Sequence, residues 1–248
     1  MDTPIVVAGR TDAGVHASGQ VVHVDVSRLA GKTRRGRIEA DENGILDLRR
    51  MMYRWNSLLP NDVRVLDAII APPGFDARFS AVRRHYRYQV SDAQWGVEPL
   101  RRKDTVAWGR ALSVDRMNEA SQSLLGLQDF AAYCKHRDGA TTIRELQRLT
   151  WQRTSRHVVE AEVSADAFCH SMVRSLVGAL LLVGDGRRGR DWPAQLLHSR
   201  VRGSAVAPAR GLTLMGVDYP PDSQLAARAK ETRNIRSRNP SPSPDGRG

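Results

Sequence analysis

Alternating apolar and polar residues predict six strands along this chain. In one of them Tyr86, Tyr88 and Val90 would share a face, with basic and polar residues on the other face. The six predicted segments are residues 4–8, 15–26, 63–70, 81–90, 157–164 and 212–219.

Apolar residues at helical spacing predict four helices. Pro60 would end the first helix, Ser113 would cap the second and Gly184 would end the third. The four predicted helices are residues 45–59, 114–125, 167–183 and 192–199.

The order of these elements is typical of an α+β fold with antiparallel sheets and helices on one side. A break at Pro72-Pro73-Gly74 predicts an N-terminal catalytic domain of residues 1–74 and a C-terminal domain of residues 75–220. Residues 221–248 are polar, with Ser-Pro repeats, and we expect a disordered basic tail there.

The charge favours a polyanionic partner. Lys and Arg total 38 against 27 Asp and Glu, a net charge of +11 in 248 residues. Residues 222–248 hold only +3 of it, so the body stays basic. The longest apolar stretch, residues 176–183, is too short to span a bilayer, so nucleic acid is a better candidate than a membrane.

The two cysteines give a second constraint on function. Cys134 and Cys169 lie far apart, without the spacing of a paired-thiol or zinc site. This arrangement favours a reduced, cytoplasmic compartment and gives no indication of a metal.

The candidate chemistry lies in the segment Gly9-Arg10-Thr11-Asp12-Ala13-Gly14. Glycines allow a tight turn and the close approach of a ligand. Asp12 could act there as a nucleophile, a general base or a metal ligand. A simple turn, in which the aspartate caps its own backbone, is the alternative reading.

Residues 8–17, Ala-Gly-Arg-Thr-Asp-Ala-Gly-Val-His-Ala, followed by Gly-Gln-Val-Val-His, closely resemble the signature of the TruA family of tRNA pseudouridine synthases. Four further segments resemble the later motifs of that family in the same order. They are Phe-Asp-Ala-Arg-Phe-Ser-Ala at 75–81, Gly-Leu-Gln-Asp-Phe at 126–130, Phe-Cys-His-Ser-Met-Val-Arg at 168–174 and Ala-Arg-Gly-Leu at 209–212.

The resemblance implies a pseudouridine synthase fold, in which two similar α/β subdomains meet at a central basic cleft. It implies a cofactor-free isomerase that converts uridine to pseudouridine in the anticodon stem-loop of tRNA, at positions 38, 39 and 40. The expected assembly is a cytoplasmic homodimer. No atom is gained in this isomerisation, so neither a cofactor nor a metal is expected.

The resemblance also assigns roles to individual residues. Asp12 would be the nucleophile, and Arg174 would form an ion pair that keeps its carboxylate charged. Arg10 would fill the space of the flipped base or hold a phosphate. The alternative for Arg174 is a solvated arginine at a helix edge.

Three further residues are candidates for substrate binding. Tyr86 would stack on the flipped uracil, or else would be a core tyrosine of its strand. Arg78 and Arg84 would contact the RNA from either side of it in the sequence.

The chain departs from the family pattern at its start. Members usually begin with a further strand and helix carrying Tyr-Asp-Gly and Gly-Trp-Gln motifs, and this sequence has neither motif. The first sheet would then be one strand short. The alternative to an active enzyme is therefore an inactive, truncated RNA-binding relic of the same family.

Overall fold

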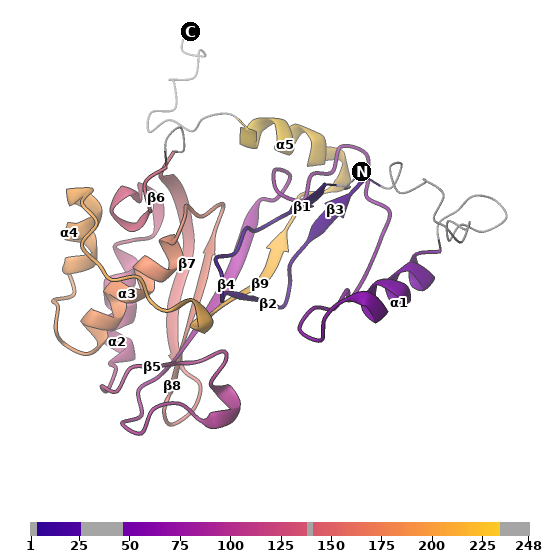
Figure 1. Ribbon diagram of the computed structural model, residues 1–248. Helices are drawn as coiled ribbons and strands as arrows, with labels where there is room; N and C mark the ends of the chain where they lie inside the picture. Colours follow the sequence, from indigo (N-terminus) through magenta and orange to yellow (C-terminus); the bar gives the residue numbers. More distant parts are fainter. Residues whose placement is uncertain (1–3, 26–46, 138–140, 234–248) are drawn as a thin grey trace, which may run out of the picture.

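The computed structural model describes residues 4–25, 47–137 and 141–233, and it is a mixed α+β structure with two sheets (Figure 1). The large sheet has the order β2-β9-β4-β8-β7-β6, with β5 pairing to β4. Its strands are β2 (His16–Ala17), β4 (Arg83–Ser91), β5 (Val106–Ala107), β6 (Gly126–Asp129), β7 (Ile143–Arg153), β8 (Val158–Ala165) and β9 (Leu212–Asp218). All pairs in it are antiparallel except β2–β9 and β4–β5.

The small sheet is the antiparallel pair of β1 (Ile5–Val7) and β3 (Val22–Val24). Three helices, α2 (Val114–Gln122), α3 (Met172–Gly184) and α4 (Trp192–Ser199), lie on one side of the large sheet (Figure 1). The other helices are α1 (Leu48–Leu58) and α5 (Leu225–Arg233). Four 3₁₀ turns complete the described elements, at Pro99–Arg101, Ala131–Tyr133, Ala209–Gly211 and Asp222–Gln224.

The core lies between the large sheet and α3. The predicted face of β4 is confirmed, because Tyr86, Tyr88 and Val90 are all buried. The helix α3 is buried on almost every side, which fits its continuous apolar sequence. At Gly178 an added Cβ would lie 1.9 Å from the carbonyl oxygen of Ala205, so only glycine permits this contact between α3 and the chain that leads to β9.

Three strands, β5, β6 and β7, were not predicted from the sequence. Alternation fails along β7 because the pairing register shifts between Leu146 and Arg148. The buried residues Leu146, Leu149 and Trp151 are therefore not spaced by two throughout. A bulge of this kind interrupts the alternation of apolar and polar residues, so the strand cannot be predicted from a period of two.

The predicted strand at residues 63–70 is wrong, since no strand forms there. Asn56 of α1 holds this segment instead, with its side chain bonded at 2.8 Å to both the N–H and the carbonyl of Val65. Leu66 and Ile69 are exposed by 79% and 74%. An apolar, β-branched segment needs a partner strand or a packed face before its propensity is expressed.

The prediction of a disordered tail from residue 221 is wrong for residues 222–233. These residues form a 3₁₀ turn and α5, with Leu225 and Ala229 buried. Ser80 donates to the carbonyl of Leu225 at 3.1 Å, and Arg233 pairs with Asp76 at 3.0 Å. The helix is polar along its length, so its order comes from these tertiary contacts. Residues 234–248 of the predicted tail lie outside the described residues.

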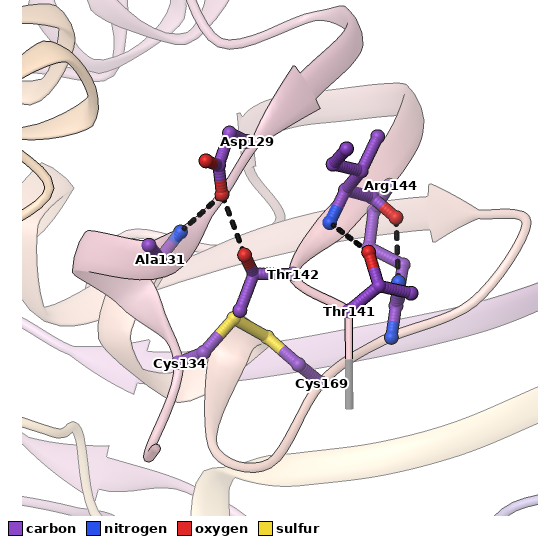
Figure 2. Close-up of a disulfide and its surroundings, with 8 residues drawn as sticks. Asp129, Ala131, Cys134, Thr141, Thr142, Arg144 and Cys169 are labelled. Atoms are coloured by element: carbon purple, nitrogen blue, oxygen red, sulfur yellow. Dashed lines mark hydrogen bonds between the residues drawn. A yellow bond between two sulfur atoms is a disulfide. The ribbon is translucent and has the colours of Figure 1, made fainter. Parts of the chain in front are cut away.

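The cysteines also differ from expectation. A disulfide joins Cys134, just after the turn Ala131–Tyr133, to Cys169, just before α3 (Figure 2). The two residues are 35 positions apart in sequence, but the fold brings their Cα atoms to 5.6 Å, within the usual disulfide range. The prediction from sequence spacing that these two cysteines are not paired is therefore wrong.

Two further findings concern the described part of the chain only. None of its helices has the length and apolar character needed to cross a membrane. Within the same residues, no three His, Cys, Asp or Glu side chains gather as a metal site would require.

Candidate active site

Residues 9–14, which we call the Asp12 loop, follow β1 and are held at both ends. The Gln20 side chain accepts from the N–H of Gly9 at 3.1 Å and donates to its carbonyl at 2.8 Å. The carbonyl of Asp12 accepts from the N–H of Val15 at 3.0 Å, and Gly14 takes a φ of +80° in this turn. The loop therefore has a fixed shape set by its neighbours.

The segment after the loop attaches it to the large sheet. Ser18 and Gly19 both donate their N–H groups to the carbonyl of Leu214 in β9, at 2.9 and 3.2 Å. An added Cβ on Gly19 would lie 2.2 Å from the carbonyl oxygen of Met215, so the approach to β9 requires glycine. Strand β9 thus carries the Asp12 loop against the sheet.

Asp12 forms an ion pair with Arg174 of α3. The Nη1 of Arg174 lies 2.8 Å from Oδ2 of Asp12, with side-chain exposures of 19% and 26%. The Nε of the same guanidinium donates to the carbonyl of Ala207 at 2.7 Å. Arg174 is therefore oriented by the backbone and presents one edge to the carboxylate, and the solvated helix-edge alternative does not describe it.

His170 is a residue at this site that the sequence analysis did not single out. Its Nε2 lies 3.2 Å from Oδ1 of Asp12, and its side chain is 48% exposed. The signal was its place beside Cys169 in the same family motif that carries Arg174. Each carboxylate oxygen of Asp12 thus has a nitrogen partner from the same segment of chain.

Tyr86 lies beside the site but is almost fully buried, at 9% exposure. Its ring meets Phe168 edge-to-face, with centroids 5.2 Å apart. Burial, with a further contribution from the charge of Asp12, raises the pKa of Tyr86 to about 12, while Arg84 acts in the opposite direction. Tyr86 is therefore a neutral phenol near neutral pH, and it packs beneath the Asp12 loop, beside Gly9.

Arg84 does not face the surface as a substrate-binding residue would. It is 7% exposed, and burial lowers its pKa from the ordinary value. Its guanidinium donates to the carbonyls of Asp166 at 2.8 Å, Ala8 at 3.3 Å and also Arg78. Because Ala8 directly precedes the Asp12 loop, we assign Arg84 to holding this loop and not to contacting RNA.

We expect Arg84→Met to lower the free energy of unfolding by about 2–4 kcal/mol, since several buried carbonyls would lose their donor. Urea denaturation measures this change. Arg83→Met is the matched control: this neighbour is exposed and donates to Gln147, so its loss should cost under about 1 kcal/mol. Equal urea midpoints for the two variants would contradict the role of Arg84.

Arg78 is close enough to Arg10 and Arg137 for their charges to act on it. Arg10 is exposed, two residues before Asp12. Burial lowers the pKa of Arg78, and the charges of Arg10 and Arg137 lower it further. The guanidinium of Arg78 lies 5.2 Å from the ring centroid of Phe79. We call Arg78, together with the two arginines whose charges act on it, Arg10 and Arg137, the arginine cluster.

Known proteins are similar to this chain over most of its length. A family model described as tRNA pseudouridine synthase matches residues 120–220. A tRNA pseudouridine synthase A of Mycobacterium leprae is 54% identical over 232 residues, 93% of this chain and 80% of that protein. Proteins of the same name from Frankia casuarinae and Streptomyces avermitilis are 53% and 52% identical, each over 94% of this chain and covering 80% and 78% of their own lengths.

The similarity covers 93–94% of this chain in each of these relatives. It is too high and too extensive for a shared fold alone, and each of these relatives is covered over more than three quarters of its length. The chain belongs to the tRNA pseudouridine synthase A family.

Proposed function

We propose that this protein isomerises uridine to pseudouridine in the anticodon stem-loop of tRNA, at positions 38, 39 and 40, with Asp12 as the nucleophile. The observation that carries the proposal is the Asp12–Arg174 pair at 2.8 Å, formed by residues 162 positions apart in the sequence. A carboxylate that an arginine orients on a partly exposed loop can reach a substrate.

The chemistry needs only the groups present. The N-glycosidic bond of uridine breaks, the uracil turns, and a bond forms between C1′ of the ribose and C5 of the base; the proton leaves C5 and the freed ring nitrogen gains one. Asp12 can assist by attacking C1′ or C6, or by removing a proton. No redox change occurs, so no cofactor has a step to perform.

The uridine must leave its stack before the carboxylate can reach it, which costs a few kcal/mol. We propose that the arginine cluster binds phosphates on either side of the flipped nucleotide, with Arg10 nearest to it. Tyr86 would contact the flipped uracil. Its ring is held edge-to-face on Phe168, which would fix its position for that contact.

We further propose that residues 1–74 and 75–220 act as two units with the RNA between them. The first unit contributes Asp12, and the second contributes Tyr86 and Arg174. A homodimer working on tRNA in the cytoplasm would complete this arrangement. Resemblance to the family supports this part of the proposal.

The test uses the full chain and an unmodified tRNA transcript, with pseudouridine mapped by carbodiimide labelling and primer extension. We expect stops in the anticodon arm with the unmutated protein and none with Asp12→Ala. Product formed by Asp12→Ala would exclude Asp12 as nucleophile. Tight tRNA binding without product from the unmutated chain would favour the inactive relic.

We expect Tyr86→Phe to retain most of the activity, within about threefold, because the ring contact with Phe168 survives. Tyr86→Ala should lower the free energy of unfolding by about 3–5 kcal/mol and largely abolish turnover, since a buried ring is lost. Because the pKa of Tyr86 is about 12, the pH–rate profiles of the unmutated chain and Tyr86→Phe should coincide up to about pH 10. Divergent profiles, measured on tRNA, would show that the hydroxyl takes part in the reaction.

A further inference from the structure

We propose that His170 is a positioning residue for Asp12, and that the Cys134–Cys169 disulfide holds His170 in place. The inference rests on the proposed function, because it assigns His170 a part in orienting the reacting carboxylate. The site would then consist of the Asp12–Arg174 pair, His170 and the disulfide that fixes the position of His170.

The first step concerns the two oxygens of the carboxylate. Arg174 takes Oδ2 at 2.8 Å, and His170 Nε2 lies 3.2 Å from Oδ1. One partner alone leaves the carboxylate free to rotate about its last torsion, whereas two partners on opposite oxygens fix its plane. A reacting group gains from such orientation because less entropy is lost on reaching the transition state.

The second step concerns how His170 is presented. Ser171, the next residue, has a φ of +64°, which is unusual for a residue other than glycine. This conformation turns the chain sharply into α3, with His170 on the side of Asp12. The carbonyl of His170 accepts from the N–H of Lys135 at 3.0 Å. A strained turn persists only where its surroundings hold it.

The disulfide provides that hold. Cys169 directly precedes His170, and Cys134 directly precedes Lys135, so the covalent bond and the hydrogen bond join the same two segments in succession. Figure 2 shows the disulfide beside the start of β7, where Asp129 accepts from Thr142 Oγ1 at 2.6 Å and from the N–H of Ala131 at 3.2 Å. The Cys134 side is thus tied to the sheet.

Together these contacts make a short path from the sheet to the carboxylate. Cys134 is 4% exposed and packs in the core, while His170 is 48% exposed at the other end of the path. Opening the disulfide would remove the covalent link between the two segments and leave the Lys135–His170 hydrogen bond and the packing of the turn Ala131–Tyr133 in the core. We therefore expect His170 to lose its fixed place when the disulfide is reduced.

The first experiment measures kcat and KM for tRNA in His170 variants. His170→Phe removes the nitrogen but keeps a ring, and we expect kcat to fall about tenfold with KM changed less than about twofold. His170→Gln places an amide N–H near the position of Nε2 and should restore most of the rate. Unchanged kcat in His170→Phe, an effect confined to KM, or no rescue by glutamine would each overturn the inference.

The second experiment uses reduction by a phosphine, which gives up two electrons to the S–S bond and becomes the phosphine oxide, while water supplies the protons of the two thiols. We expect the kcat of the unmutated chain to fall toward that of His170→Phe, and the kcat of His170→Phe to stay constant. The double variant Cys134→Ser/Cys169→Ser should have a low kcat from the start, and the phosphine should not change it. A reduction effect of equal size in His170→Phe would show that the disulfide does not act through His170.

A third measurement does not depend on turnover. The Tm losses of Asp12→Asn and His170→Phe should combine to less than their sum in the double variant, because the two side chains share one contact. Additive losses would overturn the contact between them. If the unmutated chain makes no pseudouridine but the losses are non-additive, the proposed function fails while the contact stands.

Discussion

Asp12→Asn is expected to reduce pseudouridine formation by about 10⁴-fold or more, the largest effect of any single change in this protein. The amide occupies the same space, and it cannot serve as an anionic nucleophile or base. Arg174 and His170 would then face a neutral group, so the local structure changes little while the reaction stops. Single-turnover assays on tRNA measure the loss.

Binding and folding serve as controls for this prediction. The tRNA affinity of Asp12→Asn should stay within about threefold of the unmutated chain, because the arginine cluster is intact. Asp115→Asn changes an exposed carboxylate in the first turn of α2 and should leave turnover unchanged. Residual turnover above about one per cent in Asp12→Asn would assign the essential chemistry to another group.

Arg174→Ala should lower kcat by about 10²–10³-fold, the second largest effect. The variant loses the guanidinium at 2.8 Å from the Asp12 carboxylate and also the donor to the Ala207 carbonyl. Arg174→Lys keeps the charge but cannot bond both groups with one planar fork, so we expect an intermediate loss of about tenfold. Steady-state kinetics on tRNA distinguish the two variants.

Arg148→Ala is the matched control, because Arg148 forms an exposed ion pair with Glu162 on the large sheet. Its removal should leave kcat unchanged and cost at most about 1 kcal/mol of stability. If Arg174→Ala retained more than half of the rate, the ion pair would be structural and the orientation of Asp12 would depend on other contacts.

Much of the site could be predicted from the sequence. The Asp12 loop and the helix with Arg174 lie in long matches to family motifs, and the structure brings the two residues together. The face of β4 followed from its period of two. The same period indicated that Arg84 is buried, because Arg84, Tyr86 and Tyr88 are spaced by two and share one face of β4. The neighbouring arginines suggested an RNA-binding surface instead.

The rest depended on contacts that local patterns do not encode. A register shift hid β7, and α5 gains its order from packing against the turn at Asp76. Strands β7 and β8 lie between the disulfide partners in the sequence, and it is their pairing in the sheet that brings the ends together, so the separation of 35 residues carried no signal. His170 is half-exposed and stands at a strained turn, where no periodicity applies.

The position of β9 has a consequence for how the protein matures. This strand lies between β2 and β4 in the sheet, and among the strands of the described residues it comes last in the sequence. On a ribosome the first residues emerge early, yet the segment that follows the Asp12 loop gains its sheet partner only after residue 214 has left the tunnel. Nascent chains should therefore be inactive until β9 has left the tunnel, and this contact between segments far apart in the sequence should slow folding.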